Sequence, residues 1–176
     1  MIVVSENLNG VVRQFDLCEP GLVEEFSIQI KLGSKIRRMK ECKDTDPIIY
    51  GSPFDVEQYF DQESEFGRDL YLAPGESVLA SSDDNYKMPI DYFGLLQTKG
   101  SLARLFVAIT CNDGQIEPGY EGLITLEITN HARYSVKIPF KSPIGQLYIL
   151  RCASPASKPY AGRYQNAKGP TVAHFG

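Results

Sequence analysis

The sequence is poor in the residues that build metal and redox sites. Its four cysteines stand far apart with no C-x-x-C pair, at Cys18, Cys42, Cys111 and Cys152. Neither a zinc ribbon nor a thiol redox motif is indicated, so we expect small semi-buried thiols. The two histidines, His131 and His174, lie in no H-x-E arrangement. We therefore expect both on the surface and no zinc in catalysis.

A basic excess and long apolar runs are also missing. The formal net charge is -4 and the pI is about 5.2, whereas proteins that track phosphate backbones usually carry a basic excess. An anionic ligand would therefore need a local basic pocket. No apolar run reaches bilayer length, and the start MIVVSENLNG lacks the features of a signal peptide. We expect a cytoplasmic protein with neither nucleic acid nor membrane as a partner.

The sequence has the pattern typical of a β protein: short runs of alternating apolar and polar residues, separated by the turn-forming residues Gly, Pro, Asn and Asp. The runs predict strands at 25–33, 76–81, 105–111, 122–129, 135–140 and 144–151. Asn112-Asp113-Gly114 predicts a hairpin turn after 105–111. A chain of 176 residues, 43% of them hydrophobic, suits one domain. We expect an all-β domain over 1–153, with 1–20 poorly assigned.

The spacing of apolar residues indicates a strand in one segment and a short helix in another. In the run 25–33, Phe26, Ile28, Ile30 and Leu32 share one face, which suits a strand half exposed to water. The only helix that the sequence predicts is a short one within 54–65, where apolar residues have helical spacing. The same segment is equally consistent with a surface loop.

A glutamate lies in the middle of the run 122–129. Thr125, Glu127 and Thr129 share one face of the predicted strand with Leu123, and the remaining apolar residues share the other. Taken alone, a glutamate in such a place is usually exposed to solvent, and its neighbours in the fold decide whether it has a function.

A basic cluster precedes the strand at 105–111. Lys99, Ser101 and Arg104 surround Gly100. Glycine lets a backbone approach an anion, serine offers a hydroxyl donor, and the two cations supply charge, so the cluster has the elements of a phosphate cradle. The alternative is a solvated turn with two basic residues.

The segment 154–176 is rich in Pro, Gly and small residues and shows no alternation. Such a segment is often a disordered terminus. This one also holds aromatic and basic residues that suit an arm closing over a base and its phosphates: Tyr160, Tyr164, Phe175, Lys158, Arg163 and Lys168.

Four motifs, taken in order, resemble those of the dCTP deaminase family, which is related to trimeric dUTPases. They are KGSLAR from Lys99, QIEPGYEGLITLEITN from Gln115, IGQLY from Ile144 and GRYQNAKGPT from Gly162. The resemblance implies a distorted jelly-roll domain of the dUTPase-like, β-clip type. It also implies a homotrimer with active sites between subunits and a C-terminal arm, 154–176, that closes over the nucleotide.

The resemblance also implies a role for particular residues. Glu127 would be the general acid/base that activates water for attack at C4 of cytosine, and Arg104 would orient it. Burial at a subunit interface would raise the pKa of such a carboxylate. The triphosphate would arrive as its Mg2+ complex. The implied substrate-binding residues are Lys99, Gly100, Ser101, Leu102, Ala103, Arg104, Asp113, Glu117, Thr125, Leu126, Glu127, Tyr160, Arg163 and Ala167.

Several functions remain open at this stage. The first is a dCTP deaminase that gives dUTP and ammonia, with onward hydrolysis to dUMP as an extension. The second is a dUTP diphosphatase, in which an acidic residue at position 117 would activate water against the phosphate chain. The third is a noncatalytic nucleotide-binding relative, because Gly100, Glu117 and Ala167 depart from the family pattern. A β-sandwich binding module unrelated to nucleotides would require four accidental motif matches.

Overall fold

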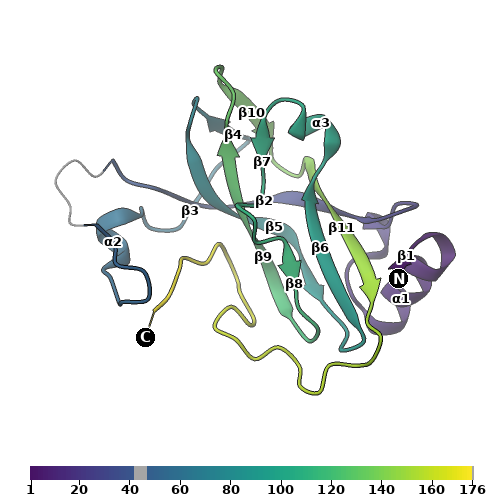
Figure 1. Cartoon of the computed structure of the whole chain (residues 1–176). Helices are drawn as coiled ribbons and strands as arrows, with labels where there is room; N and C mark the ends of the chain where they lie inside the picture. Colours follow the sequence, from purple (N-terminus) through teal and green to yellow (C-terminus); the bar gives the residue numbers. More distant parts are fainter. Residues whose placement is uncertain (42–46, 176) are drawn as a thin grey trace.

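The computed structural model describes residues 1–41 and 47–175 and is built mainly of β-strands (Figure 1). In chain order the elements are β1 (Ile2–Val3), α1 (Ser5–Phe15), the 3-10 turn η1 (Pro20–Leu22), β2 (Ile28–Arg38), α2 (Val56–Tyr59), β3 (Ser64–Glu65), β4 (Asp69–Leu72), β5 (Ser77–Lys87), β6 (Tyr92–Thr98), α3 (Gly100–Ala103), β7 (Val107–Ala108), β8 (Gln115–Ile116), β9 (Glu121–Asn130), β10 (Val136–Pro139) and β11 (Pro143–Arg151). The predicted all-β class is therefore confirmed.

Among the described residues, nine strands form one curled antiparallel sheet. Its path runs β7-β9-β5-β2-β11-β6-β8, with β1 attached to β11 and β3 attached to β2. Strands β10 and β4 pair separately. Most neighbours in the sheet are far apart in the sequence, as in a jelly roll and unlike a meander. Strand β9 thus lies between β7 and β5, near one end of the path.

Strand β9 has the alternation that the sequence predicts. Ile124, Leu126 and Ile128 are buried in the core, whereas Thr125 and Glu127 on the opposite face are half-buried. Pairing with β5 over nearly the whole length of β9 fixes this register. Because side chains alternate with period two, a slip of one residue would move the glutamate into the core.

Strand β2 begins later than predicted, and this changes the place of Phe26. The side chains of Ile28, Ile30 and Leu32 are fully buried, but Phe26 is 63% exposed. The chain turns just before the strand, where the main-chain N–H of Glu24 donates to Ser27 O at 2.8 Å. Placing Phe26 on the buried face of the strand was therefore wrong, because the residue lies in this turn.

The helices differ most from the prediction. Helix α1 was not predicted, although Leu8, Val11 and Val12 are buried at helical spacing. The polar residues and Gly10 between them obscured that pattern. The helix predicted within 54–65 is reduced to α2, whose first turn is capped by Asp55 accepting from the main-chain N–H of Glu57. No helix of the described residues combines the length and apolar character needed to cross a bilayer.

The hairpin predicted at Asn112-Asp113-Gly114 is absent. Strand β7 pairs with β9, whereas β8 pairs with β6, so the segment between them crosses from one part of the sheet to another. The backbone at Gly114 lies close to β6, and a Cβ at this position would be only 2.5 Å from Leu96 O. The tight turn is therefore absent, although the predicted runs 105–111 and 122–129 still pair antiparallel, as β7 with β9.

The cysteines differ in burial, and both histidines lie on the surface. Cys18 is buried, and burial raises the pKa of its thiol to about 12. Cys152 is partly buried, but Cys111 is exposed and departs from the expected semi-buried thiols. Cys42 lies outside the described residues. His131 and His174 are exposed, as predicted.

A buried asparagine holds the end of β9 to the loop between β4 and β5. The side-chain amide of Asn130 donates to Leu72 O, Ala73 O and Tyr134 O at 3.2, 3.1 and 2.9 Å. Its carbonyl oxygen accepts from the main-chain N–H of Ala132 at 3.0 Å. One side chain thus contacts four main-chain groups, with its two amide hydrogens shared among three carbonyls, because a polar group at this depth needs partners.

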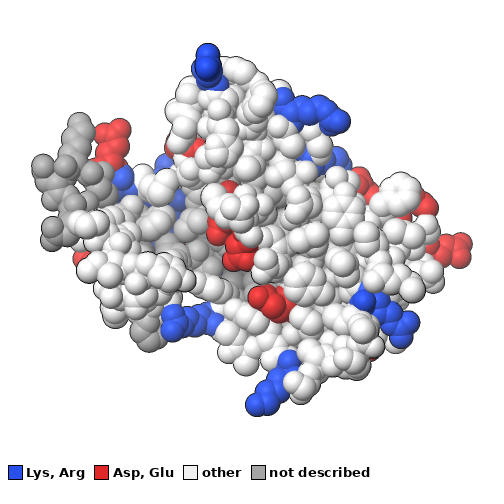
Figure 2. Space-filling model, viewed as in Figure 1, with Lys and Arg blue, Asp and Glu red and all other residues white. Residues whose placement is uncertain are grey.

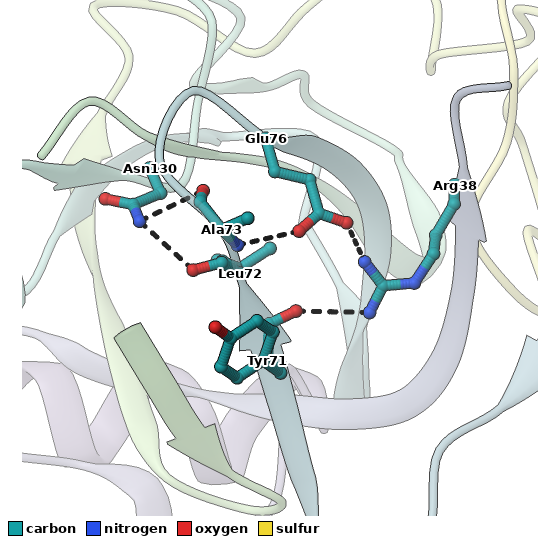
Figure 3. Close-up of polar contacts among 6 residues, drawn as sticks. All are labelled: Arg38, Tyr71, Leu72, Ala73, Glu76 and Asn130. Atoms are coloured by element: carbon teal, nitrogen blue, oxygen red, sulfur yellow. Dashed lines mark hydrogen bonds and ion pairs between the residues drawn. The ribbon is translucent and has the colours of Figure 1, made fainter. Parts of the chain in front are cut away.

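A carboxylate organises the other side of the same loop (Figure 3). Glu76 accepts a hydrogen bond from the main-chain N–H of Ala73 at 2.8 Å and forms an ion pair with Arg38 of β2. Arg38 also donates to Tyr71 O at 3.2 Å. Together with Asn130, these contacts tie β2, β4, β5 and β9 at one end of the sheet.

Replacing Asn130 with alanine should lower the free energy of unfolding by about 2–4 kcal/mol, because several buried main-chain groups lose their partner. Denaturant unfolding followed by circular dichroism measures this change. The matched control is Asn7→Ala, since Asn7 is exposed on α1. We expect that control to stay within about 0.5 kcal/mol of the parent protein. Equal stability of the two variants would contradict the role given to Asn130.

Candidate active site

A cavity of about 370 Å³ opens between β8, β9 and the C-terminal tail, defined here as residues 154–175. The tail contains no helix or strand and crosses the lower part of the view in Figure 1. The residues that line the cavity are Phe60, Leu79, Asp113, Gln115, Ile116, Glu117, Tyr120, Ile124, Thr125, Glu127, Tyr160, Tyr164, Thr171, Val172 and Ala173.

Glu127 is the best-positioned carboxylate in this cavity. Its main-chain N–H donates to Ile109 O at 3.0 Å, which keeps the segment after β7 against β9. Its carboxylate oxygen Oε2 accepts a hydrogen bond from the main-chain N–H of Cys111 at 2.7 Å. A backbone donor thus fixes one carboxylate oxygen. The other accepts no hydrogen bond from the described residues, so the geometry suits a group that exchanges protons with a ligand.

The tail is ordered against β9 and does not behave as a free terminus. Asn166 N–H donates to Glu121 O at 2.7 Å, and Leu123 N–H donates to Ala167 O at 2.9 Å. Further along, Thr171 N–H donates to Thr125 Oγ1 at 3.1 Å. The tail therefore runs beside the edge of β9 that β7 leaves unpaired and forms one wall of the cavity.

Gln165 secures the start of this contact. Its side-chain carbonyl accepts from Glu121 N–H at 3.0 Å, and its amide donates to Gly119 O at 2.9 Å. Gly119 has φ +87°, and a Cβ there would lie 2.5 Å from Pro159 Cβ, so only glycine lets the tail approach so closely. The amide of Gln165 is thus engaged with the main chain.

Two tyrosines pack beside each other in the lining. The rings of Tyr120 and Tyr160 lie 5.8 Å apart between centroids. Burial, and then the nearby Tyr160 and Glu117, raise the pKa of Tyr120 to about 12. Its hydroxyl donates to Leu123 O at 2.6 Å. Burial also raises the pKa of Tyr160. Both phenols therefore stay neutral near pH 7 and offer ring surface against a ligand.

The lining is acidic. Asp113, Glu117 and Glu127 contribute carboxylates, and the lining residues include no lysine or arginine. Figure 2 shows acidic atoms gathered near the middle of this face, whereas most lysine and arginine atoms lie toward the edges of the view. A polyanionic ligand would be repelled here unless cations came from elsewhere.

The basic cluster expected to hold phosphates lies outside this cavity. It forms α3, at the top of the view in Figure 1. The Lys99 ammonium lies 3.2 Å from Glu24 Oε1. The pKa of the Glu24 carboxyl lies below its usual range, chiefly because Gln29 donates to it, and further because of Lys99. Arg104 is exposed and reaches back over Gly100.

The predicted site residues thus fall into two groups. Those that line the cavity are Asp113, Glu117, Thr125, Glu127 and Tyr160. Those that do not are Lys99, Gly100, Ser101, Leu102, Ala103, Arg104, Leu126, Arg163 and Ala167. Leu126 is fully buried on the core face of β9, and Ala167 contacts β9 through its main chain. Arg163 is exposed and donates to His174 O.

Other lining residues were missed, and one expected residue lies elsewhere. Phe60 lies in the segment 54–65, whose helical spacing carried no prediction of a site. Thr171 lies in the tail, which shows no alternation, although it ends the quoted GRYQNAKGPT motif. Phe175 packs against Tyr50 and Phe54, with ring centroids 5.3 and 6.2 Å apart, and is not among the lining residues. A place for Phe175 over a bound base therefore stays a prediction.

The described residues hold no group of three or more His, Cys, Asp and Glu side chains suited to a metal ion. A carboxylate held by a backbone N–H, a polar strand face and neutral aromatic rings are the features available for chemistry here.

Comparisons with known proteins identify the family of this chain. A family model described as dCTP deaminase-like matches residues 5–152. The "dCTP deaminase, dUMP-forming" of Clavibacter michiganensis subsp. michiganensis is 35% identical over 164 residues, covering 89% of this chain and 80% of the relative. The protein of that name from Streptomyces coelicolor is 35% identical over 169 residues, covering 93% and 87%.

A solved structure supports the fold. The 2'-deoxycytidine 5'-triphosphate deaminase from Agrobacterium tumefaciens superposes with a TM-score of 0.64 at 18% sequence identity. The match covers 84% of this chain and 47% of that one, so the chain spans about half the length of this structural relative. The resemblance found in the four motifs is confirmed by the family model and by relatives at 35% identity, and the chain belongs to the dCTP deaminase-like family.

Proposed function

We propose that this protein converts dCTP to dUMP by deaminating cytosine at C4 and then cleaving pyrophosphate from the nucleotide. The observation that carries the deamination step is the Glu127 carboxylate, held in the cavity by the N–H of Cys111. The curated relatives are named as dUMP-forming, which supports the onward hydrolysis to dUMP that the sequence left as an extension, with dUTP as the intermediate. One dCTP and two waters then give dUMP, pyrophosphate and ammonia.

Glu127 performs the proton transfers of the first step. Its unbonded oxygen accepts a proton from water as the water oxygen attacks C4. The same carboxyl passes this proton to the ring nitrogen N3. It then takes the second proton from the hydroxyl now on C4 and delivers it to the amine, so that the C4=O bond forms as the C–N bond breaks and ammonia leaves. The N–H of Cys111 keeps the carboxylate from rotating away, because it bonds the other oxygen. No step in this sequence requires zinc.

The second step needs a water directed at the phosphate chain. Glu117 lines the same cavity, close enough to Tyr120 and Tyr160 to influence their ionisation. We assign to it the activation of this water. An enzyme with dUTP diphosphatase activity alone would need the water activated by Glu117 but not the deamination step. This activity is the alternative function.

Phosphate binding requires cations that the cavity lining does not supply. We place these on α3 of a second copy, where Lys99, Ser101 and Arg104 form the basic cluster. In a homotrimer each cavity would receive α3 from its neighbour, and Mg2+ would arrive bound to the triphosphate. Such sharing explains why one chain presents an acidic cavity and a separate basic cluster.

Glu127→Gln should reduce ammonia release from dCTP by at least about a hundred-fold, because the amide cannot accept the proton of water. The variant should still bind dCTP, since the side chain keeps its shape. Purified protein with Mg2+ is incubated with dCTP, and ammonia, pyrophosphate and dUMP are quantified. The matched control is Glu121→Gln, at the start of the same strand and outside the lining, which should retain ammonia release.

The same assay separates the alternatives. Ammonia release by Glu127→Gln at the parent rate would remove Glu127 from catalysis. Pyrophosphate from dUTP without ammonia from dCTP would indicate a dUTP diphosphatase. Nucleotide binding by the parent protein without any turnover would indicate a noncatalytic relative.

Mixing Glu127→Gln with Arg104→Ala should restore activity that neither variant has alone. A site between copies can combine the intact Glu127 of one variant with the intact Arg104 of the other. Random subunit exchange should then give about a quarter of the parent activity, since each contribution is intact in half of the copies. Dissociation and re-association precede the assay, and native mass spectrometry confirms mixed oligomers. An inactive mixture of confirmed mixed oligomers would place the whole site within one chain.

A further inference from the structure

The tail touches the catalytic face of β9 at one point beyond Ala167. Thr171 Oγ1 lies 2.9 Å from Thr125 Oγ1, and Thr171 N–H donates to the same Thr125 oxygen at 3.1 Å. Both residues line the cavity. Within the part of the tail that the structure describes, these are the hydrogen bonds that join residues after Ala167 to β9.

This contact lies beside the carboxylate. Thr125 precedes Glu127 by two residues and points to the same face of the strand. Thr171 is followed by Val172 and Ala173, which complete the wall of the cavity on that side. The Thr125 hydroxyl, together with the hydroxyl and the N–H of Thr171, therefore joins this wall to the strand that carries the carboxylate.

The other anchors of the tail lie further from Glu127. Gln165 bonds the main chain at Gly119 and Glu121, and Ala167 pairs with Gly122 and Leu123. Past these points the carbonyl of Lys168 accepts from Lys35 of β2 and not from β9. Residues 171–173 thus lie between these anchors and the contacts of His174 O with Arg163 and of Phe175 with Tyr50 and Phe54. Between the two sets of anchors, the hydrogen bonds to Thr125 are what join this segment to β9.

We propose that the hydrogen-bonded pair Thr125–Thr171 holds the tail closed beside Glu127, which makes Thr171 a positioning residue for deamination. The proposal rests on the function proposed above. Thr171 acts through the wall it fixes: a closed wall keeps bulk water from the carboxylate and confines the nucleotide. Loss of the pair weakens nucleotide binding more than it slows the proton transfers, because Glu127 keeps its bond to Cys111.

Threonine and valine have nearly the same shape, so substitutions can separate the hydroxyl from its packing. Thr171→Val should raise KM for dCTP about ten-fold with a smaller change in kcat, the effect of losing one shielded hydrogen bond. Thr171→Ser restores the hydroxyl and should recover most of the affinity. In a Thr125→Val background the Thr171→Val change should add little, because the pair is already broken.

KM and kcat for dCTP are measured by steady-state kinetics for the parent protein, Thr171→Val, Thr171→Ser, Thr125→Val and the double variant of Thr125→Val with Thr171→Val. His174→Ala is the matched control in the tail, since its side chain is exposed and lies outside the lining. KM values for Thr171→Val and the control that both equal the parent value would overturn the proposal. So would independent, additive effects of the two threonine changes.

A nucleotide-free measurement separates this proposal from the proposed function. Hydrogen exchange of the unliganded protein should be about ten-fold faster at the Thr171 amide in Thr125→Val than in Thr125→Ser, with exchange in β5 and β11 unchanged. If the parent protein fails to deaminate dCTP, the proposed function is wrong and this exchange still tests the pair. Equal exchange in the two variants would show that the hydroxyls do not hold the tail.

Discussion

The pairing of β9 with β5 is the constraint on which the rest of the site depends. It fixes which face of β9 enters the core and which faces the cavity, because side chains alternate with period two. Burial of Ile124, Leu126 and Ile128 on one face stabilises that register, and the cost of exposing them would oppose a slip. Glu127 is thus held in the cavity by the apolar residues beside it in the sequence.

The opposite edge of β9 is shared by three segments. β7 pairs with its end, the segment around Ile109 and Cys111 contacts Glu127, and the tail follows its first half. The carboxylate therefore lies where the edge passes from one partner to the next. Such a junction leaves room for a ligand beside the strand while backbone donors still fix the side chain, which an unbroken sheet would not provide.

The alternation of apolar and polar residues along β9 made the strand and its two faces predictable from the sequence. The strand that carries Thr125 and Glu127 was predicted because its pattern is local. Helix α1 was missed because polar residues and a glycine interrupt its buried stripe. The tight turn at Asn112 was wrong because the chain first pairs with β6 through β8 before it returns to β7 as strand β9. Thr171 reaches the cavity only through the path of the tail, which no local pattern encodes.

The separation of charges has a further physical consequence. Three carboxylates in one cavity repel a triphosphate, so a single chain is poorly suited to bind one. Lys99 is already paired with Glu24, which neutralises part of the basic cluster and orients its ammonium before any phosphate arrives. If a second copy supplies this cluster, cations and carboxylates meet only in the assembled protein. Assembly would then control phosphate binding, whereas Glu127 and the Cys111 N–H that holds its carboxylate belong to one chain.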